Sequence, residues 1–119
     1  MTVCPLNGRK ILLVEDEYFI VDDLVQAFKA AGAEVVGPAA NVNDALSLIK
    51  KTERLDGALL DVNLQGEMAY PVADALIARG VPFVFTTGYD KASVPERFAH
   101  ITLREKPLNP GKLAKSLFA

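Results

Sequence analysis

Short apolar runs that each end abruptly in polar residues are the feature that most constrains the fold of this chain. Continuous apolar runs of this kind are typical of parallel β-strands that are buried on both faces. Four runs occur: 11–14 before Glu15-Asp16-Glu17, 58–60 before Asp61, 83–85 before Thr86-Thr87-Gly88, and 101–103 before Arg104-Glu105-Lys106. Because open α/β sheets bind ligands at the carboxyl ends of their strands, we expect these polar groups around one pocket.

Helical patterns fill the segments between the runs. Ile20, Leu24 and Phe28 recur at helical spacing after the first run. Asn41 can cap a second helix, with Asp44 three residues on. The alternation predicts an α/β fold, a doubly wound five-stranded parallel sheet of the flavodoxin-like (βα)5 type with strand order 2-1-3-4-5. In that order the first and third strands are neighbours, so their polar ends meet in one crevice.

The remaining elements are predicted from proline, glycine and capping residues. We expect a second strand at Val35-Val36 closed by Gly37-Pro38, a loop over 63–67, a third helix with Pro71 in its first turn, a short or mobile helix within 91–100, and a last helix capped by Asn109 with Pro110 in its first turn. Five strand–helix units then fill the chain, so residues 1–119 are predicted to form one domain without an effector domain.

Composition argues against several classes of function. With 119 residues, half of them apolar, the chain is long enough to bury one core. Its formal net charge of −2 offers no electrostatic case for binding nucleic acid. No apolar stretch approaches the roughly 20 residues that span a bilayer, and the single cysteine, Cys4, fits a reducing compartment. We therefore expect a cytoplasmic protein that binds neither nucleic acid nor a membrane directly.

Asp16 and Asp61 are the centre of the predicted site. Two carboxylates held close together repel each other, and Mg²⁺ compensates because it takes oxygen ligands from one or two carboxylates. Glu15 is a further candidate ligand, directly or through water, and so is the backbone carbonyl of Asn63. The alternative interpretation is that strand-end acids only cap the following helices, and we prefer that alternative for Glu17.

Asp61 lies last on a buried run and is the candidate nucleophile, because an aspartate can attack phosphorus to form an acyl phosphate. Such a transfer needs neutralisation of the phosphoryl charge more than proton abstraction. Lys106 can supply that charge, and Thr87 can donate its hydroxyl to a phosphoryl oxygen. Since side chains alternate along a strand, only one of Thr86 and Thr87 can point into the pocket. Thr87 is favoured because it adjoins Gly88.

Taken together, these residues make the chain resemble the receiver domain of two-component response regulators over essentially its whole length. Glu15-Asp16 resemble the acidic pair that holds Mg²⁺ in that family. Asp61 resembles the phosphoacceptor, and Asn63 the position whose backbone carbonyl binds the metal. Thr87 is similar to the family's Thr/Ser, and Lys106-Pro107 to its lysine with the following proline.

The resemblance implies a phosphorylation-controlled switch. A sensor histidine kinase or a histidine phosphotransfer protein would donate a phosphoryl group to Asp61 in an Mg²⁺-dependent step. The domain would catalyse that transfer and its own slow dephosphorylation without being a conventional enzyme. If the chain is complete, output would come from contact with a downstream protein partner or from phosphoryl relay, as in stand-alone receivers.

One position departs from the family pattern and affects the expected output. Leu103 stands three residues before Lys106, where the family has its switch aromatic. The usual coupled motion of a threonine and an aromatic ring is therefore not expected. Tyr89, two residues past Thr87, is a candidate to take over part of that role.

Two other functions remain as alternatives. A phosphohydrolase of the haloacid-dehalogenase type also forms an aspartyl phosphate, but it uses an acidic residue two positions after its nucleophile, where this chain has Asn63. A phosphorylation-independent pseudo-receiver would only bind a partner, and the complete set of site residues argues against it.

Overall fold

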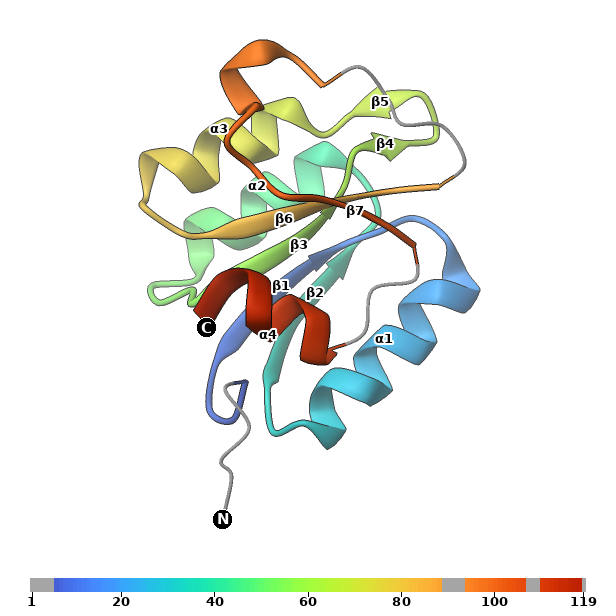
Figure 1. Ribbon diagram of the computed structural model, residues 1–119, viewed down its shortest axis with the longest axis vertical. Coiled ribbons are helices and arrows are strands. Elements are labelled where there is room, and N and C mark those ends of the chain that lie inside the picture. Colours follow the sequence, from blue (N-terminus) through green and yellow to red (C-terminus); the bar gives the residue numbers. More distant parts are fainter. Residues whose placement is uncertain (1–5, 89–93, 107–109, 119) are drawn as a thin grey trace.

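The structure, a computed structural model, describes residues 6–88, 94–106 and 110–118 of the chain. Its centre is a parallel sheet of five strands in the order β2-β1-β3-β6-β7 (Figure 1). Numbered within this sheet alone, the order is 2-1-3-4-5, so the predicted doubly wound fold is confirmed. The strands are β1 (Lys10–Val14), β2 (Glu34–Ala39), β3 (Gly57–Asp61), β6 (Phe83–Thr87) and β7 (Leu103–Glu105).

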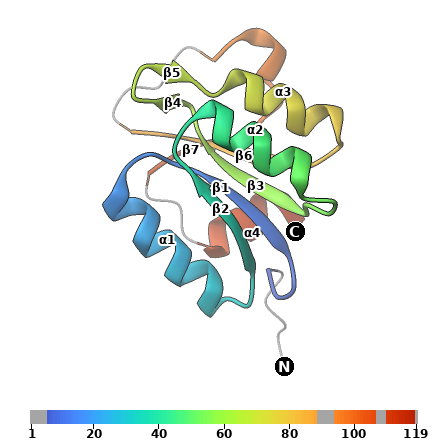
Figure 2. The same ribbon diagram turned by 180° about the vertical axis from the view of Figure 1, so that it is seen from behind.

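Helices cover both faces of the sheet, as Figures 1 and 2 show from opposite sides. α1 (Tyr18–Ala30) and α4 (Pro110–Phe118) pack on one face, and α2 (Val42–Lys51) and α3 (Tyr70–Ala78) on the other. Side chains of β3 alternate between the two cores, so that Leu59 packs with α1 and α4 whereas Leu60 packs with α2 and α3. No helix in the described ranges has the length and apolar character needed to cross a membrane.

Capping residues and prolines set the helix starts. Asn41 caps α2 as predicted, because its Oδ1 accepts a hydrogen bond of 2.8 Å from the backbone N of Asp44. Pro71 lies in the first turn of α3, and α4 begins at Pro110. Asn109, the predicted cap of α4, lies outside the described residues.

β2 is longer than predicted, because it continues through Gly37-Pro38. A proline is tolerated in a sheet at an edge strand or a bulge. Both conditions hold here: β2 is an edge strand, and its register with β1 shifts between Leu12 and Val14. Gly37 has φ +98°, and a Cβ there would lie 3.1 Å from the carbonyl oxygen of Leu13. The Gly-Pro pair therefore bends the strand instead of ending it.

The predicted loop after β3 contains a short antiparallel hairpin formed by β4 (Asn63–Leu64) and β5 (Glu67–Met68). Gln65 (φ 54°) and Gly66 (φ 92°) between the two strands both have positive φ, as a type I′ hairpin turn requires. Glu67 Oε1 accepts a hydrogen bond of 3.1 Å from the backbone N of Val42. This bond ties the hairpin to the start of α2 and holds it beside the end of β3.

The last third of the chain departs most from the prediction. β7 spans 103–105 instead of 101–103, with Leu103 opposite Phe85 of β6. In residues 94–100, the described part of the predicted helix 91–100, the regular element is a 3-10 turn, Glu96–Phe98. Pro95 precedes that turn, and a proline without an N–H does not continue an α-helix.

The two faces of α1 offer a matched pair of substitutions. Phe28 is 0% exposed in the core beneath α1 and α4, whereas Phe19 on the same helix is 85% exposed. We expect Phe28→Ala to lower the free energy of unfolding by about 3–5 kcal/mol, as truncation of a buried aromatic ring does. Phe19→Ala should change it by less than about 0.5 kcal/mol. Urea denaturation followed by circular dichroism measures both, and equal losses would contradict this packing of α1.

Candidate functional site

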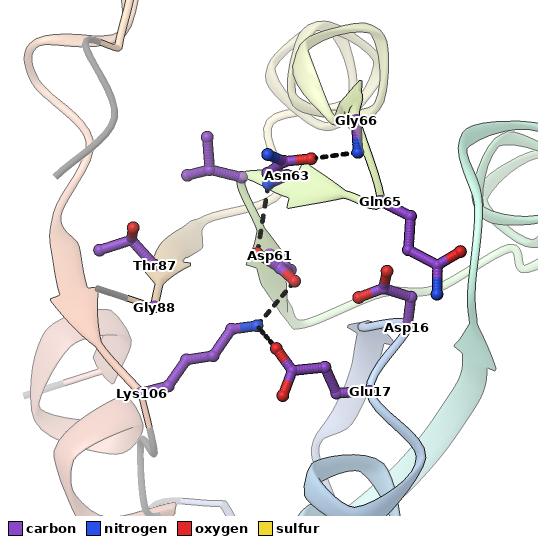
Figure 3. Close-up of a pocket in the computed structure, with 10 residues that line it drawn as sticks. Asp16, Glu17, Asp61, Asn63, Gln65, Gly66, Thr87, Gly88 and Lys106 are labelled. Carbon is purple, nitrogen blue, oxygen red and sulfur yellow. Dashed lines mark hydrogen bonds and ion pairs between the residues drawn. The ribbon is translucent and has the colours of Figure 1, made fainter. Parts of the chain in front are cut away.

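A pocket opens at the carboxyl ends of β1, β3 and β6, beside the end of β7 (Figure 3). These ends are neighbours because β3 lies between β1 and β6 and pairs with both. Acids, amides, a hydroxyl and a lysine therefore share one cavity. The residues that line it are Asp16, Glu17, Asp61, Val62, Asn63, Gln65, Gly66, Thr87, Gly88 and Lys106.

Three carboxylates meet at this pocket. Glu15, Asp16 and Asp61 each offer one oxygen, and these oxygens all lie within 4.8 Å of one another. Glu15 is 5% exposed and Asp61 3%, so two of the three groups are almost fully removed from water. Hard oxygen donors in such a cluster are the ligand type that Mg²⁺ takes in proteins. The chemistry of this donor set therefore fits a magnesium ion.

Glu15 is anchored by the backbone that follows β1. Its Oε1 accepts hydrogen bonds from the backbone N of Asp16 (3.0 Å) and of Glu17 (3.1 Å). Burial, and next the negative charge of Asp61, raise the pKa of the Glu15 carboxyl to about 7. Hydrogen bonds from Glu17 N and from Lys106 favour the ionised form, but they do not cancel that rise.

Lys106 is the counter-ion of the acidic cluster. Its Nζ lies 2.8 Å from Asp61 Oδ2, 3.0 Å from Glu15 Oε2 and 3.1 Å from Glu17 Oε1. Burial alone would lower the pKa of the Lys106 ammonium, but the hydrogen bonds to Asp61 and Glu15 outweigh burial, so its pKa is shifted upward. The lysine therefore stays charged at neutral pH.

The β4–β5 hairpin shapes the surroundings of Asp61. Asp61 Oδ1 accepts a hydrogen bond of 3.2 Å from the backbone N of Asn63. The Asn63 side chain in turn accepts a 2.6 Å hydrogen bond from the backbone N of Gly66, within the hairpin turn (Figure 3). Asn63 thus lines the pocket while its side-chain oxygen supports the turn. The metal-ligand role of its backbone carbonyl stays a prediction.

The two threonines at the end of β6 have different surroundings. Thr86 is buried, and its Oγ1 lies 3.5 Å from the carbonyl oxygen of Leu60. Thr87 lines the pocket next to Gly88. The carbonyl oxygen of Thr87 also accepts a 2.9 Å hydrogen bond from the backbone N of Lys106. That bond sets Thr87 and Lys106 side by side where β6 and β7 end.

Comparison with solved structures assigns the chain to a family. The chain matches the solution structure of SdrG from Sphingomonas melonis Fr1 at 38% sequence identity with a TM-score of 0.79, covering 98% of this chain and 96% of that one. This chain is a response regulator receiver domain. A CheY-like receiver domain protein from Methanospirillum hungatei JF-1 matches at 29% identity over 92% of this chain and 90% of its own (TM-score 0.74). No family model and no curated protein matches the chain.

A further match concerns a longer relative of the receiver domain. The response regulator PhyR from Brucella abortus is 26% identical over 98% of this chain and 50% of its own length, with a TM-score of 0.76. These relatives support a phosphoacceptor switch family for the chain.

The receiver domain brings all the predicted site residues to one pocket. Glu15 lies against it in contact with Lys106, and the others line the cavity itself: Asp16, Asp61, Asn63, Thr87 and Lys106. Tyr89, the candidate substitute for the switch aromatic, and Pro107 lie outside the described residues. Leu103 is partly buried and packs against the core beneath α2 and α3.

Four lining residues of the receiver domain were not predicted as part of its site: Glu17, Val62, Gln65 and Gly66. Glu17 does occupy the N-cap position of α1, but its side chain makes no cap hydrogen bond and contacts Lys106 instead. The sequence feature that indicates a place in the site is its position directly after the predicted acidic pair. Gln65 and Gly66 reach the pocket through a positive-φ turn, which a Gln-Gly pair indicates far more weakly than Asn-Gly or Asp-Gly.

The raised pKa of Glu15 predicts how stability depends on pH in metal-free buffer. A carboxyl whose pKa rises from 4.5 to about 7 on folding stabilises the folded state below about pH 4.5, and that contribution is lost as the pH rises through 7. Glu15→Gln imitates the protonated form and should remove this loss. Urea denaturation of both proteins with a chelator, from about pH 5 to about pH 8, measures the difference. Parallel pH profiles of the two proteins would contradict a raised pKa of Glu15.

Proposed function

We propose that this receiver domain accepts a phosphoryl group on Asp61 in an Mg²⁺-dependent reaction and thereby switches its contacts with a downstream protein. The donor would be a sensor histidine kinase or a histidine phosphotransfer protein. The observation that carries the proposal is the environment of Asp61: a carboxylate 3% exposed, 2.8 Å from an ammonium and clustered with two further acids beside an open pocket.

The transfer forms one bond and breaks one. A carboxylate oxygen of Asp61 attacks the phosphorus of a phosphohistidine, and the P–N bond breaks as the P–O bond forms. The leaving imidazole nitrogen keeps the electron pair and takes a proton from solvent. The product is an acyl phosphate on Asp61 and a neutral histidine on the donor, with no general base required on the receiver.

Charge neutralisation is the main task of the residues around Asp61. Phosphoryl transfer spreads negative charge over the equatorial oxygens, so fixed positive charge and hydrogen-bond donors favour it. Lys106 supplies an ammonium and Thr87 a hydroxyl on the same side of the pocket. Asp16 and Asp61 would hold Mg²⁺, with Glu15 and the carbonyl of Asn63 as further candidate ligands, and the bound ion would supply the remaining neutralisation.

Dephosphorylation is hydrolysis of the acyl phosphate, with water as the nucleophile. Water attacks phosphorus, the bond to the Asp61 oxygen breaks, and the carboxylate is regenerated together with dihydrogen phosphate, which releases a proton to solvent. The domain would catalyse this slow step itself, and it is therefore better described as a self-resetting switch than as a conventional enzyme.

The output is proposed to run through protein–protein contact without an aromatic switch on β7. Leu103 lies opposite Phe85, and Phe85 contacts Phe98 of the 3-10 turn with ring centroids 5.7 Å apart. A shift at Thr87, two residues beyond Phe85, can therefore reach the surface around that turn through packed side chains. Such a change would alter what a downstream partner contacts.

Replacement of the phosphoacceptor tests the function directly. Wild-type protein incubated with acetyl phosphate or phosphoramidate and Mg²⁺ should gain the mass of one phosphoryl group, and Asp61→Asn should gain none. Asp23→Asn is the matched control, because Asp23 is an exposed aspartate on α1 and does not line the pocket. Intact-mass spectrometry gives the result.

Two other outcomes would overturn the proposal. Absence of an adduct on the wild type with every donor would favour a pseudo-receiver that binds its partner without phosphorylation. Steady multiple turnover of a simple phosphate ester would instead favour the phosphohydrolase.

The acidic cluster predicts a separate effect on the metal. We expect Asp16→Asn to weaken Mg²⁺ binding by at least about tenfold, since even groups that only support a metal ligand contribute that much. Asp23→Asn should leave Mg²⁺ affinity unchanged. Titration with Mg²⁺ followed by NMR measures both constants, and equal affinities in the two variants would place the metal elsewhere.

A further inference from the structure

We propose that Glu17 is a positioning residue that holds the Lys106 ammonium in the unphosphorylated pocket and releases it when a phosphoryl group enters. The inference rests on the proposed function, and it identifies Glu17 as a carboxylate that competes with the phosphoryl group for the Lys106 ammonium. Figure 3 shows the Glu17 carboxylate turned toward the Lys106 ammonium, from the side of the pocket opposite Thr87.

The Glu17 side chain does not make the capping hydrogen bond that its N-cap position suggests. A residue at the N-cap of a helix usually accepts a hydrogen bond from an N–H of the first turn. Glu17 makes no such side-chain bond to α1, and its Oε1 lies 3.1 Å from Lys106 Nζ. The contact links the start of α1 to the end of β7, two elements that are 89 residues apart along the chain at these positions.

The number of hydrogens on the ammonium limits how many acceptors Lys106 can bind at one time. A lysine ammonium has three hydrogens and no acceptor. Three carboxylates surround Lys106 at hydrogen-bond distance: Asp61 at 2.8 Å, Glu15 at 3.0 Å and Glu17 at 3.1 Å. In this arrangement the ammonium has no hydrogen left for a further acceptor. A phosphoryl oxygen can therefore bind Lys106 only if one of the three contacts weakens.

Glu17 is the partner that can leave at the lowest cost. The Glu15 carboxylate is 5% exposed and is anchored by two backbone N–H groups, so its movement would strand a buried charge. The Glu17 side chain is 58% exposed, and water can solvate its carboxylate once the lysine has turned away. Asp61 stays in the pocket, because it is the residue that carries the phosphoryl group. The exchange of Glu17 for a phosphoryl oxygen then keeps the ammonium paired throughout.

The affinity for a phosphoryl mimic tests this exchange. Removal of the competing carboxylate in Glu17→Gln should tighten beryllofluoride binding, at saturating Mg²⁺, by about three- to fivefold, the upper part of the range expected for one partly exposed ion pair. Asp23→Asn removes the same charge from the same helix and should leave the affinity within about twofold of wild type. NMR titration gives the constants, and thermal unfolding shows that each variant is folded.

A second background isolates the role of Lys106. In Lys106→Met, the added substitution Glu17→Gln should change beryllofluoride affinity by less than about twofold, because the residue through which Glu17 acts is gone. Salt dependence provides an independent readout if Lys106→Met binds beryllofluoride too weakly to measure. A gain that comes from a direct contact persists at about 0.5 M salt, whereas a gain from the general field of the charge disappears.

The outcomes separate this inference from the proposed function. Wild-type protein that binds no beryllofluoride would overturn the phosphoacceptor function itself. Wild-type binding with no gain in Glu17→Gln would overturn the role of Glu17 alone. So would an equal gain in Asp23→Asn, a gain retained in Lys106→Met, or a gain abolished by salt.

Discussion

Three carboxylates share one ammonium at the carboxyl edge of the sheet, and the chemistry of the pocket depends on that contact. Lys106 Nζ lies within 3.1 Å of Asp61, Glu15 and Glu17, and the first two acids are almost fully buried. Without the lysine, two buried negative charges would face each other away from water, which is strongly unfavourable. In the proposed function, the same ammonium would neutralise the phosphoryl group once one of its three carboxylate contacts weakens.

The sheet supplies the geometry of this contact. β3 lies between β1 and β6, so the ends that carry Asp16, Asp61 and Thr87 converge. The edge strand β7 adds Lys106, whose backbone N bonds to the carbonyl oxygen of Thr87. Helices bury both faces of the sheet in two separate cores, which leaves the strand ends as the open region. Leu103 packs against the core beneath α2 and α3 and does not line the pocket.

Local patterns predicted most of the fold, and the differences have local causes. The continuous apolar runs marked β1, β3 and β6, and crossover handedness then restricted the strand order. Gly37-Pro38 predicted the end of β2, but an edge strand with a bulge tolerates both residues. Lys106 and Thr87 could be placed at one edge of the sheet from the sequence. Glu17 could not be assigned, because its side-chain direction depends on the turn between β1 and α1.

The sequence by itself determined which polar groups follow buried strands, where α2 is capped and which family the chain resembles, because these depend on short-range patterns. Only the tertiary structure decided how the charges are paired. Glu15 and Lys106 are 91 residues apart in sequence yet in direct contact, and the pKa of Glu15 rises to about 7 only because burial and Asp61 act on it together. Electrostatic energy depends on distance in space and on access to water, and both quantities arise only when the strands are assembled into the sheet.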